Sequence, residues 1–216
     1  MVIQSFVFNK NQVNTYIVSD EITKETMIID CGCTSLEDFD KIVSYVSENK
    51  LIFKYSFCTH LHFDHIFGIN FIYEIYHIMT YACRLDMELL EWNKLCSVFM
   101  GLNDDEKNLL ATNYIQWIEK PFDKFQLGNN EFTIISTPGH SPGSISIYCE
   151  TKKVIFCGDV LFINGQGRTD FDGGNSSDLV QSIDFILNLN KETLVLPGHY
   201  QPFRIKDRLP CNLATK

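Results

Sequence analysis

The segment Thr-His-Leu-His-Phe-Asp-His, residues 59–65, places three of the chain's six histidines and one carboxylate within seven residues. Alternate side chains share a face in extended backbone, so His60 and His62 can reach one cation. A turn that follows can direct Asp64 and His65 toward another cation. Neutral imidazole and carboxylate ligands suit zinc, iron, manganese or cobalt better than calcium or magnesium. The segment therefore predicts a transition-metal site.

Three further candidate ligands each follow a glycine in a loop just beyond a predicted strand. They are His140, Asp159 and His199. Loops at strand ends are the usual place for ligands in α/β proteins. A single histidine of this kind is more often part of the scaffold, but five of the six histidines occupy such positions and only His77 is left for a purely structural role. The predicted ligand set is His60, His62, Asp64, His65, His140, Asp159 and His199.

Short stretches rich in β-branched and aromatic residues predict the strands that position these loops. They cover residues 2–8, 13–19, 26–30, 51–58, 132–136, 145–149, 154–157 and 193–196. Helical spacing of apolar residues predicts a helix that follows an N-cap at Ser35, and another helix over about 177–189. The strand-then-helix order of both halves indicates two packed sheets with helices outside.

A helical insert is predicted at about 84–120, where apolar residues again recur at helical spacing. The first part of this pattern includes Leu89, Trp92 and Phe99, and the second part includes Tyr114 and Trp117. We expect the insert to form a cap over the metal site.

Length, composition and net charge narrow the classes to which this protein can belong. A chain of 216 residues that is 45% hydrophobic can bury the core of one domain, here residues 1–216. Its formal charge of -9 disfavours a nucleic-acid partner. There is no export signal and no apolar run long enough for a bilayer, so we expect no membrane association, a cytoplasmic location and eight reduced cysteines. Nothing in the sequence specifies an oligomeric state.

The H-x-H-x-D-H signature, with later His, Asp and His in glycine-flanked loops, resembles the metallo-β-lactamase superfamily over essentially the whole chain. Within that superfamily, segments 158–162 and 167–171 resemble the glyoxalase II (hydroxyacylglutathione hydrolase) group. The compact bacterial type, which lacks a C-terminal helical domain, is the most similar. The resemblance implies an α/β fold: a four-layer αββα sandwich of two mixed sheets with outer helices and metals at one edge.

The resemblance also implies a role for each candidate ligand. The first metal would be bound by His60, His62 and His140. The second metal would be bound by Asp64, His65 and His199. Asp159 would bridge the two, and Asp64 and Asp159 are the expected catalytic residues. The implied cofactors are two divalent transition-metal ions, with zinc as the first choice and iron or manganese as alternatives.

Four other residues match positions of this family. Asn14 and Tyr16 match a pattern near the family's N-terminus. Asp30 matches its buried acidic residue near the metal loop, and we expect Asp30 to support the ligands. Arg168 matches the region where relatives hold the anionic thiol carrier and is the candidate substrate-binding residue. Alternatively, Arg168 forms a buried pair with Asp170 that braces the loop.

The predicted function is hydrolysis of a small-molecule 2-hydroxyacyl thioester, similar to S-lactoylglutathione, by a metal-bridging hydroxide. One alternative is a mononuclear iron persulfide dioxygenase, which shares the metal loop. Tyr200 stands where those dioxygenases usually have an aspartate, and this favours the hydrolase. A second alternative is a non-catalytic metal-binding protein, against which the complete ligand set argues.

Overall fold

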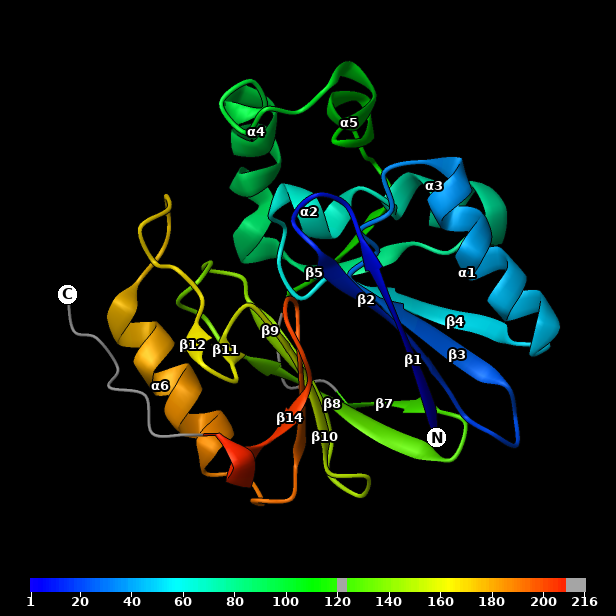
Figure 1. The fold of residues 1–216 in the computed structure, drawn as a ribbon, viewed down its shortest axis with the longest axis vertical. Helices are drawn as coiled ribbons and strands as arrows, with labels where there is room; N and C mark the ends of the chain where they lie inside the picture. The colour runs from blue at the N-terminus through cyan, green and yellow to red at the C-terminus, as the bar shows by residue number, and fades with distance from the viewer. Residues whose placement is uncertain (120–123, 209–216) are drawn as a thin grey trace.

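Two mixed sheets pack face to face and carry helices on both outer faces (Figure 1). The computed structural model describes residues 1–119 and 124–208. Each sheet contains six strands and combines parallel with antiparallel pairs. The predicted αββα sandwich of two mixed sheets is therefore confirmed.

The first sheet is built from the N-terminal half of the chain. Its strand order is β1 (Val2–Phe8), β2 (Val13–Ser19), β3 (Glu25–Ile29), β4 (Ile52–Phe57), β5 (Thr80–Cys83) and β6 (Ile115–Ile118). The first three strands form an antiparallel meander, and β3 to β6 run parallel. Parallel neighbours need crossover connections, which here are helical and place the ends of β4 and β5 at the same edge.

The second sheet is built from the C-terminal half. Its order is β14 (Phe203–Arg204), β13 (Leu194–Pro197), β10 (Val154–Gly158), β9 (Ile145–Cys149), β8 (Asn130–Ser136) and β7 (Lys124–Leu127). Strands β10 and β13 are parallel, and their connection contains α6 (Ser176–Leu187). A small hairpin of β11 (Leu161–Phe162) and β12 (Gly165–Gln166) precedes that helix.

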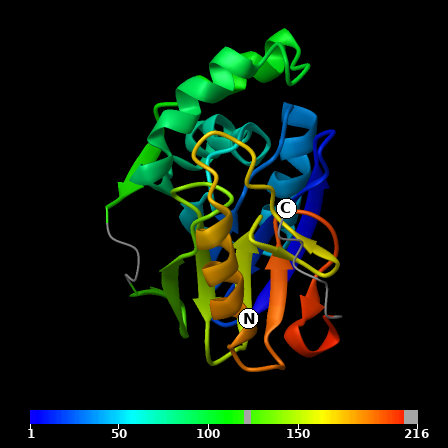
Figure 2. The same cartoon turned by 90° about the vertical axis from the view of Figure 1, so that its left-hand side faces the viewer.

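The outer helices bury one apolar stripe each. Helix α1 (Leu36–Glu48) begins after the predicted cap, where the Ser35 hydroxyl accepts the Asp38 N–H at 3.2 Å. Its buried residues Phe39, Ile42 and Val46 lie on one face and pack with α3 (Ile69–Tyr76) on the first sheet. Helix α6 packs in the same way on the outer face of the second sheet (Figure 2).

The segment between β5 and β6 is helical only in part. It contains a 3-10 turn η1 (Arg84–Asp86), α4 (Met87–Cys96) and α5 (Asp104–Leu109), which stand above the sheets (Figures 1 and 2). The prediction of helix through Lys120 is wrong at residues 115–118, which form β6, while Lys120 lies outside the described residues. Parallel pairing with residues 80–83 supplies backbone hydrogen bonds and overrides the helical spacing of the apolar residues.

Two other expectations concern the chain as a whole. In the described ranges, every cysteine is a free thiol, in agreement with the expectation of reduced cysteines. Among the helices of the same ranges, none combines the length and the apolar character needed to span a bilayer.

The main core lies between the two sheets, and Phe156 is fully buried in it. Its ring meets the ring of Tyr16, from the other sheet, at a centroid distance of 5.3 Å.

We predict that Phe156→Ala lowers the free energy of unfolding by about 3–5 kcal/mol, because the cavity cannot close between two sheets. Urea denaturation of chelator-treated protein measures this. Val7→Ala, at a position that is 60% exposed, should change stability by less than about 0.5 kcal/mol. Equal effects would contradict this account of the core.

Candidate metal centre

The histidine-rich segment leaves the sheet at the end of β4. His60 and His62 lie in the connection after the strand, and Asp64 and His65 lie in the short helix α2 (Phe63–Ile66). Residue 62 has extended backbone, and helical backbone begins at residue 63. The predicted change from extended to turned backbone is therefore present, and all four side chains are buried.

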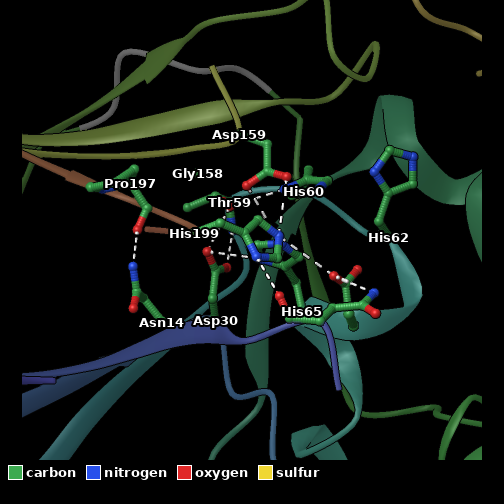
Figure 3. Close-up of polar contacts among 12 residues, drawn as sticks. Asn14, Asp30, Thr59, His60, His62, His65, Gly158, Asp159, Pro197 and His199 are labelled. Carbon is green, nitrogen blue, oxygen red and sulfur yellow. Dashed lines mark hydrogen bonds and ion pairs between the residues drawn. The ribbon is translucent and has the colours of Figure 1, made fainter. Parts of the chain in front are cut away.

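The three other candidates lie in loops of the second sheet. His140 follows β8, Asp159 follows β10 directly, and His199 follows β13. In Figure 3, Asp159, His65 and His199 point toward one another from different elements. The structure brings the predicted residues into three overlapping groups whose ligand atoms lie within 4.8 Å of one another. The groups are His60, His62 and His140; His60, His65 and Asp159; and Asp64, His65 and His199.

Asp159 occupies the middle of this arrangement. One of its carboxylate oxygens, Oδ2, lies 3.6 Å from His140 Nε2 and 3.3 Å from His199 Nε2. The other oxygen, Oδ1, lies 3.7 Å from His65 Nε2. A single carboxylate therefore faces members of both predicted metal groups.

Several buried atoms of the site have no hydrogen-bond partner within the described part of the chain. Three of them, His60 Nε2, His65 Nε2 and Asp159 Oδ1, belong to one of the candidate ligand groups. A buried polar atom without a partner costs about 1–3 kcal/mol, and native proteins rarely leave several together. Imidazole nitrogens and a carboxylate oxygen fit a borderline transition-metal cation, which would satisfy all three.

Hydrogen bonds behind the site determine which nitrogen of each ring is available. The Thr59 hydroxyl donates to Asp30 Oδ2 at 2.8 Å and lies 3.1 Å from His60 Nδ1. Since that hydroxyl proton is used, His60 Nδ1–H must donate to it, and Nε2 keeps its lone pair for a cation. His199 Nδ1 donates to the carbonyl of Asn11 at 2.9 Å, which again leaves Nε2 facing the centre.

Asp30 contacts the candidate ligand His65 directly and the candidate ligand His60 through Thr59. In addition to the hydroxyl, it accepts the Thr59 N–H at 2.7 Å, and its Oδ2 lies 3.1 Å from His65 Nδ1. Asn14 and Tyr16 act on the opposite loop, because both donate to the carbonyl of Pro197, two residues before His199. Figure 3 shows the contact of Asn14. The first sheet thereby holds a ligand loop of the second sheet in place.

Two glycines permit the close approach of these loops. A Cβ atom at position 198 would collide with Asp159 Oδ1 and with the His65 ring. A Cβ at position 158 would collide with the Thr59 hydroxyl, and the backbone there has φ +51. The glycines before Asp159 and His199 are therefore required by contact across the two sheets.

The protonation equilibria of the histidines differ across the site. Burial, together with the neighbouring His140, lowers the pKa of His62 to about 3, and burial likewise lowers the pKa of His60. Burial also acts to lower the pKa of His65, but Asp30, Asp64 and Asp159 outweigh it and raise that pKa to about 10. In the metal-free protein, His62 is neutral and His65 carries a proton at pH 7.

Asn11 is a site residue that sequence reasoning missed. It lies in the turn between β1 and β2, its side-chain amide donates to Asp64 Oδ2 at 3.0 Å, and its carbonyl accepts from His199. It therefore positions two of the three members of the second predicted group. No local pattern distinguishes this asparagine from others in a polar turn.

Asp86, in the 3-10 turn before α4, is a second missed residue. Its buried carboxylate accepts the Leu61 N–H at 3.1 Å, the Ser141 hydroxyl at 2.8 Å and the Gly143 N–H. Burial raises its pKa. Asp86 ties the loop of His60 and His62 to the loop of His140, and so fixes the two halves of the first predicted group.

Arg168 lies at the rim of the site, with its guanidinium already occupied. Its Nε and Nη2 donate to the two carboxylate oxygens of Asp170 at 2.8 and 2.7 Å. The pair is present as the second interpretation expected, but it is exposed and not buried, since the two side chains are 68% and 64% accessible.

A cavity of about 960 Å³ opens over the candidate ligands. Asp64, Asp159 and His199 contribute to its floor, and Trp92 and Met100 from the insert contribute to its wall. The insert therefore borders the cavity through these two residues.

The family model described as the metallo-beta-lactamase superfamily matches residues 9–199. The chain belongs to this superfamily. A probable metallo-hydrolase of Bacillus subtilis, YqgX, is 34% identical over 206 residues, which are 87% of this chain and 85% of that protein. Glyoxylase B2 of Dictyostelium discoideum is 31% identical over 86% of this chain and 65% of its own length.

Solved structures of the superfamily share this fold. TTHA1623 in a di-iron-bound form has a TM-score of 0.77 and 28% identity, and covers 94% of this chain and 96% of its own. ETHE1 from Myxococcus xanthus has a TM-score of 0.74 and 26% identity, and covers 96% and 81%. The matched region includes every candidate ligand.

We predict that Asn11→Ala lowers the metal affinity of the group Asp64, His65 and His199 by about 10–100-fold, because Asp64 and His199 each lose a positioning contact. Competition with a chromophoric chelator measures this affinity. Asn49→Ala, at the C-terminal end of α1, is the matched control and should leave metal affinity unchanged. Equal affinities in the two variants would show that Asn11 does not position ligands.

Metal binding should release at least one proton at pH 7. His65 is protonated below a pKa of about 10 in the metal-free protein, and a cation must displace that proton. Apparent metal affinity should therefore rise as pH rises from 6 to 8, by about tenfold per pH unit for each proton released. Calorimetric titration in buffers of different ionisation enthalpy counts the protons. Affinity that does not vary with pH would contradict a protonated His65.

Proposed function

We propose that this chain is a metal-dependent hydrolase that cleaves a 2-hydroxyacyl thioester at a centre of two divalent transition-metal ions. The observation that carries the proposal is the position of Asp159, whose Oδ2 lies within 3.6 Å of His140 Nε2 and within 3.3 Å of His199 Nε2. A carboxylate in this position can bridge two cations.

The ligand groups of the structure support a division between two ions. His60, His62 and His140 would hold one ion, and Asp64, His65 and His199 would hold the other. Seven side chains exceed the ligands that one tetrahedral or five-coordinate ion accepts. Zinc is the first choice, and iron and manganese suit the same ligands; the di-iron form of TTHA1623 supports iron as an alternative.

Two bound cations would supply a hydroxide at neutral pH and polarise the substrate carbonyl. Asp159 and Asp64 would hold the two cations in place. Asp159 faces both ligand groups, and the side-chain amide of Asn11 fixes Asp64. The walls of the cavity above them would position a bound substrate.

The cavity lining supports a thioester over an ester or amide with a poor leaving group. Apart from the candidate ligands Asp64 and Asp159, no carboxylic acid and no lysine lines the cavity among the described residues. Arg168 cannot act as an acid at neutral pH. A thiolate leaves without a strong general acid, so a thioester is the acyl substrate that this lining suits.

The 2-hydroxyacyl group is supported by the glyoxalase II resemblance and by the relative named glyoxylase B2. S-lactoylglutathione is the reference substrate for this reason. The structural similarity to ETHE1 leaves the persulfide dioxygenase as the competing outcome of the same assay.

Metal-replete protein should hydrolyse S-lactoylglutathione and release its thiol. A thiol reagent detects the released thiol. The expected result is turnover that chelation abolishes and metal restores. Oxygen consumption on glutathione persulfide without thioester hydrolysis would reject the proposal in favour of a dioxygenase.

Asp159→Ala should abolish this turnover and lower the occupancy of both metals, because the bridging carboxylate is lost. His77→Ala is the matched control, since His77 is exposed at the C-terminal end of α3 and should keep metal content and rate. Elemental analysis and kinetics give both readouts. Equal loss of metal in the two variants would refute the division between ligand and scaffold histidines.

A further inference from the structure

An aromatic wall stands on one side of the cavity, next to the first candidate ligand group. The ring of Phe171 lies 5.2 Å from the ring of His62 and 6.0 Å from that of His140. Trp92, from α4, lies 6.1 Å from Phe171 and 6.4 Å from His62. Both aromatic residues line the cavity and are only partly buried, so part of each side chain remains accessible to a ligand.

The wall is assembled from two distant segments. The loop that leads into α6 carries Phe171, and α4 carries Trp92. This loop rises beside α4 in Figure 1 and beneath it in Figure 2. Near His199 the cavity is lined by Phe162 and Tyr200, whose rings lie 5.2 Å apart, and by the polar residues Asn11 and Gln201.

Arg168 strengthens the aromatic wall and does not serve as a free cation. Its guanidinium carbon lies 4.4 Å from the ring centre of Phe171, while its nitrogens donate to Asp170. It is the one arginine or lysine that lines the cavity in the described ranges. A carboxylate on the substrate would have to compete with Asp170, so this side of the cavity favours an uncharged group.

We infer that the acyl group of the substrate carries an aryl substituent, which binds against Trp92 and Phe171 beside His62. The inference rests on the proposed thioester hydrolysis and names the acyl class that the site selects. Aromatic rings pair favourably at centroid separations of about 4.5–7 Å, and a phenyl group buries far more apolar area than the methyl group of lactate. The enzyme should therefore discriminate strongly between substrates that differ in the acyl group and weakly between substrates that differ in the thiol carrier.

The kinetic test compares S-mandeloylglutathione with S-lactoylglutathione in metal-replete enzyme. The two substrates share the glutathione carrier and the 2-hydroxyl group. They differ only in the acyl substituent, which is a phenyl group in mandeloyl and a methyl group in lactoyl. We expect kcat/KM to favour the mandeloyl substrate by about tenfold or more. Trp92→Ala and Phe171→Ala should each reduce this ratio toward one. Leu95→Ala, on the same helix at a position 77% exposed and outside the cavity lining, should keep the ratio.

A binding measurement tests the same wall without turnover. The chain has two tryptophans, so Trp117→Phe leaves Trp92 as the only indole. Mandelate should quench its fluorescence at concentrations about tenfold lower than lactate. Tighter binding of mandelate without hydrolysis of either thioester would retain the aryl site and reject the proposed reaction. Hydrolysis of both thioesters at equal rates, with equal binding of both acids, would retain the reaction and overturn the aryl site.

Discussion

The organisation of this protein depends on the burial of Asp159 among imidazoles that come from both sheets. A buried carboxylate and a buried protonated histidine are tolerated only when they are paired and hydrogen-bonded. Asp159 has His199 and His140 within 3.6 Å, yet its Oδ1 has no hydrogen-bond partner in the described residues. A bound cation would satisfy this oxygen and replace the proton of His65, and the surrounding loops bring the candidate ligands together around it.

The two sheets meet this requirement by holding each other's loops. Asp30, at the end of β3, fixes Thr59 and His65. Asn14 and Tyr16, from β2, hold the carbonyl of Pro197 across the interface. These contacts join residues of the first sheet to loops of both halves, so the sandwich and the site depend on one another. The glycines at 158 and 198 provide the space for that contact.

Much of this arrangement could be predicted from local sequence. Strands 2–8, 13–19 and 145–149 have the predicted bounds, because alternating β-branched and aromatic residues encode them directly. All seven candidate ligands cluster in the structure, because they lie in segments that follow strands, at the edge where the loops of an α/β fold converge. Strand β6 was not predictable, since it depends on pairing with β5 and its apolar spacing also suits a helix.

The residues that sequence reasoning missed act over long separations. Asn11 contacts Asp64 across 53 positions and His199 across 188, and no local pattern records either contact. Asp86 joins two ligand loops from within a segment that shows only helical spacing. For Arg168 the sequence motif predicted a position near the site, but only the folded loop shows that its guanidinium stacks on Phe171.

The central claim is that one carboxylate joins two cations. Crystals of metal-saturated protein, measured on both sides of the metal absorption edge, would locate the ions directly. The account predicts two anomalous peaks about 3.5–4 Å apart on either side of Asp159, one near His60 and the other near His199. A single peak at full saturation, with Asp159 bound to it alone, would contradict the account.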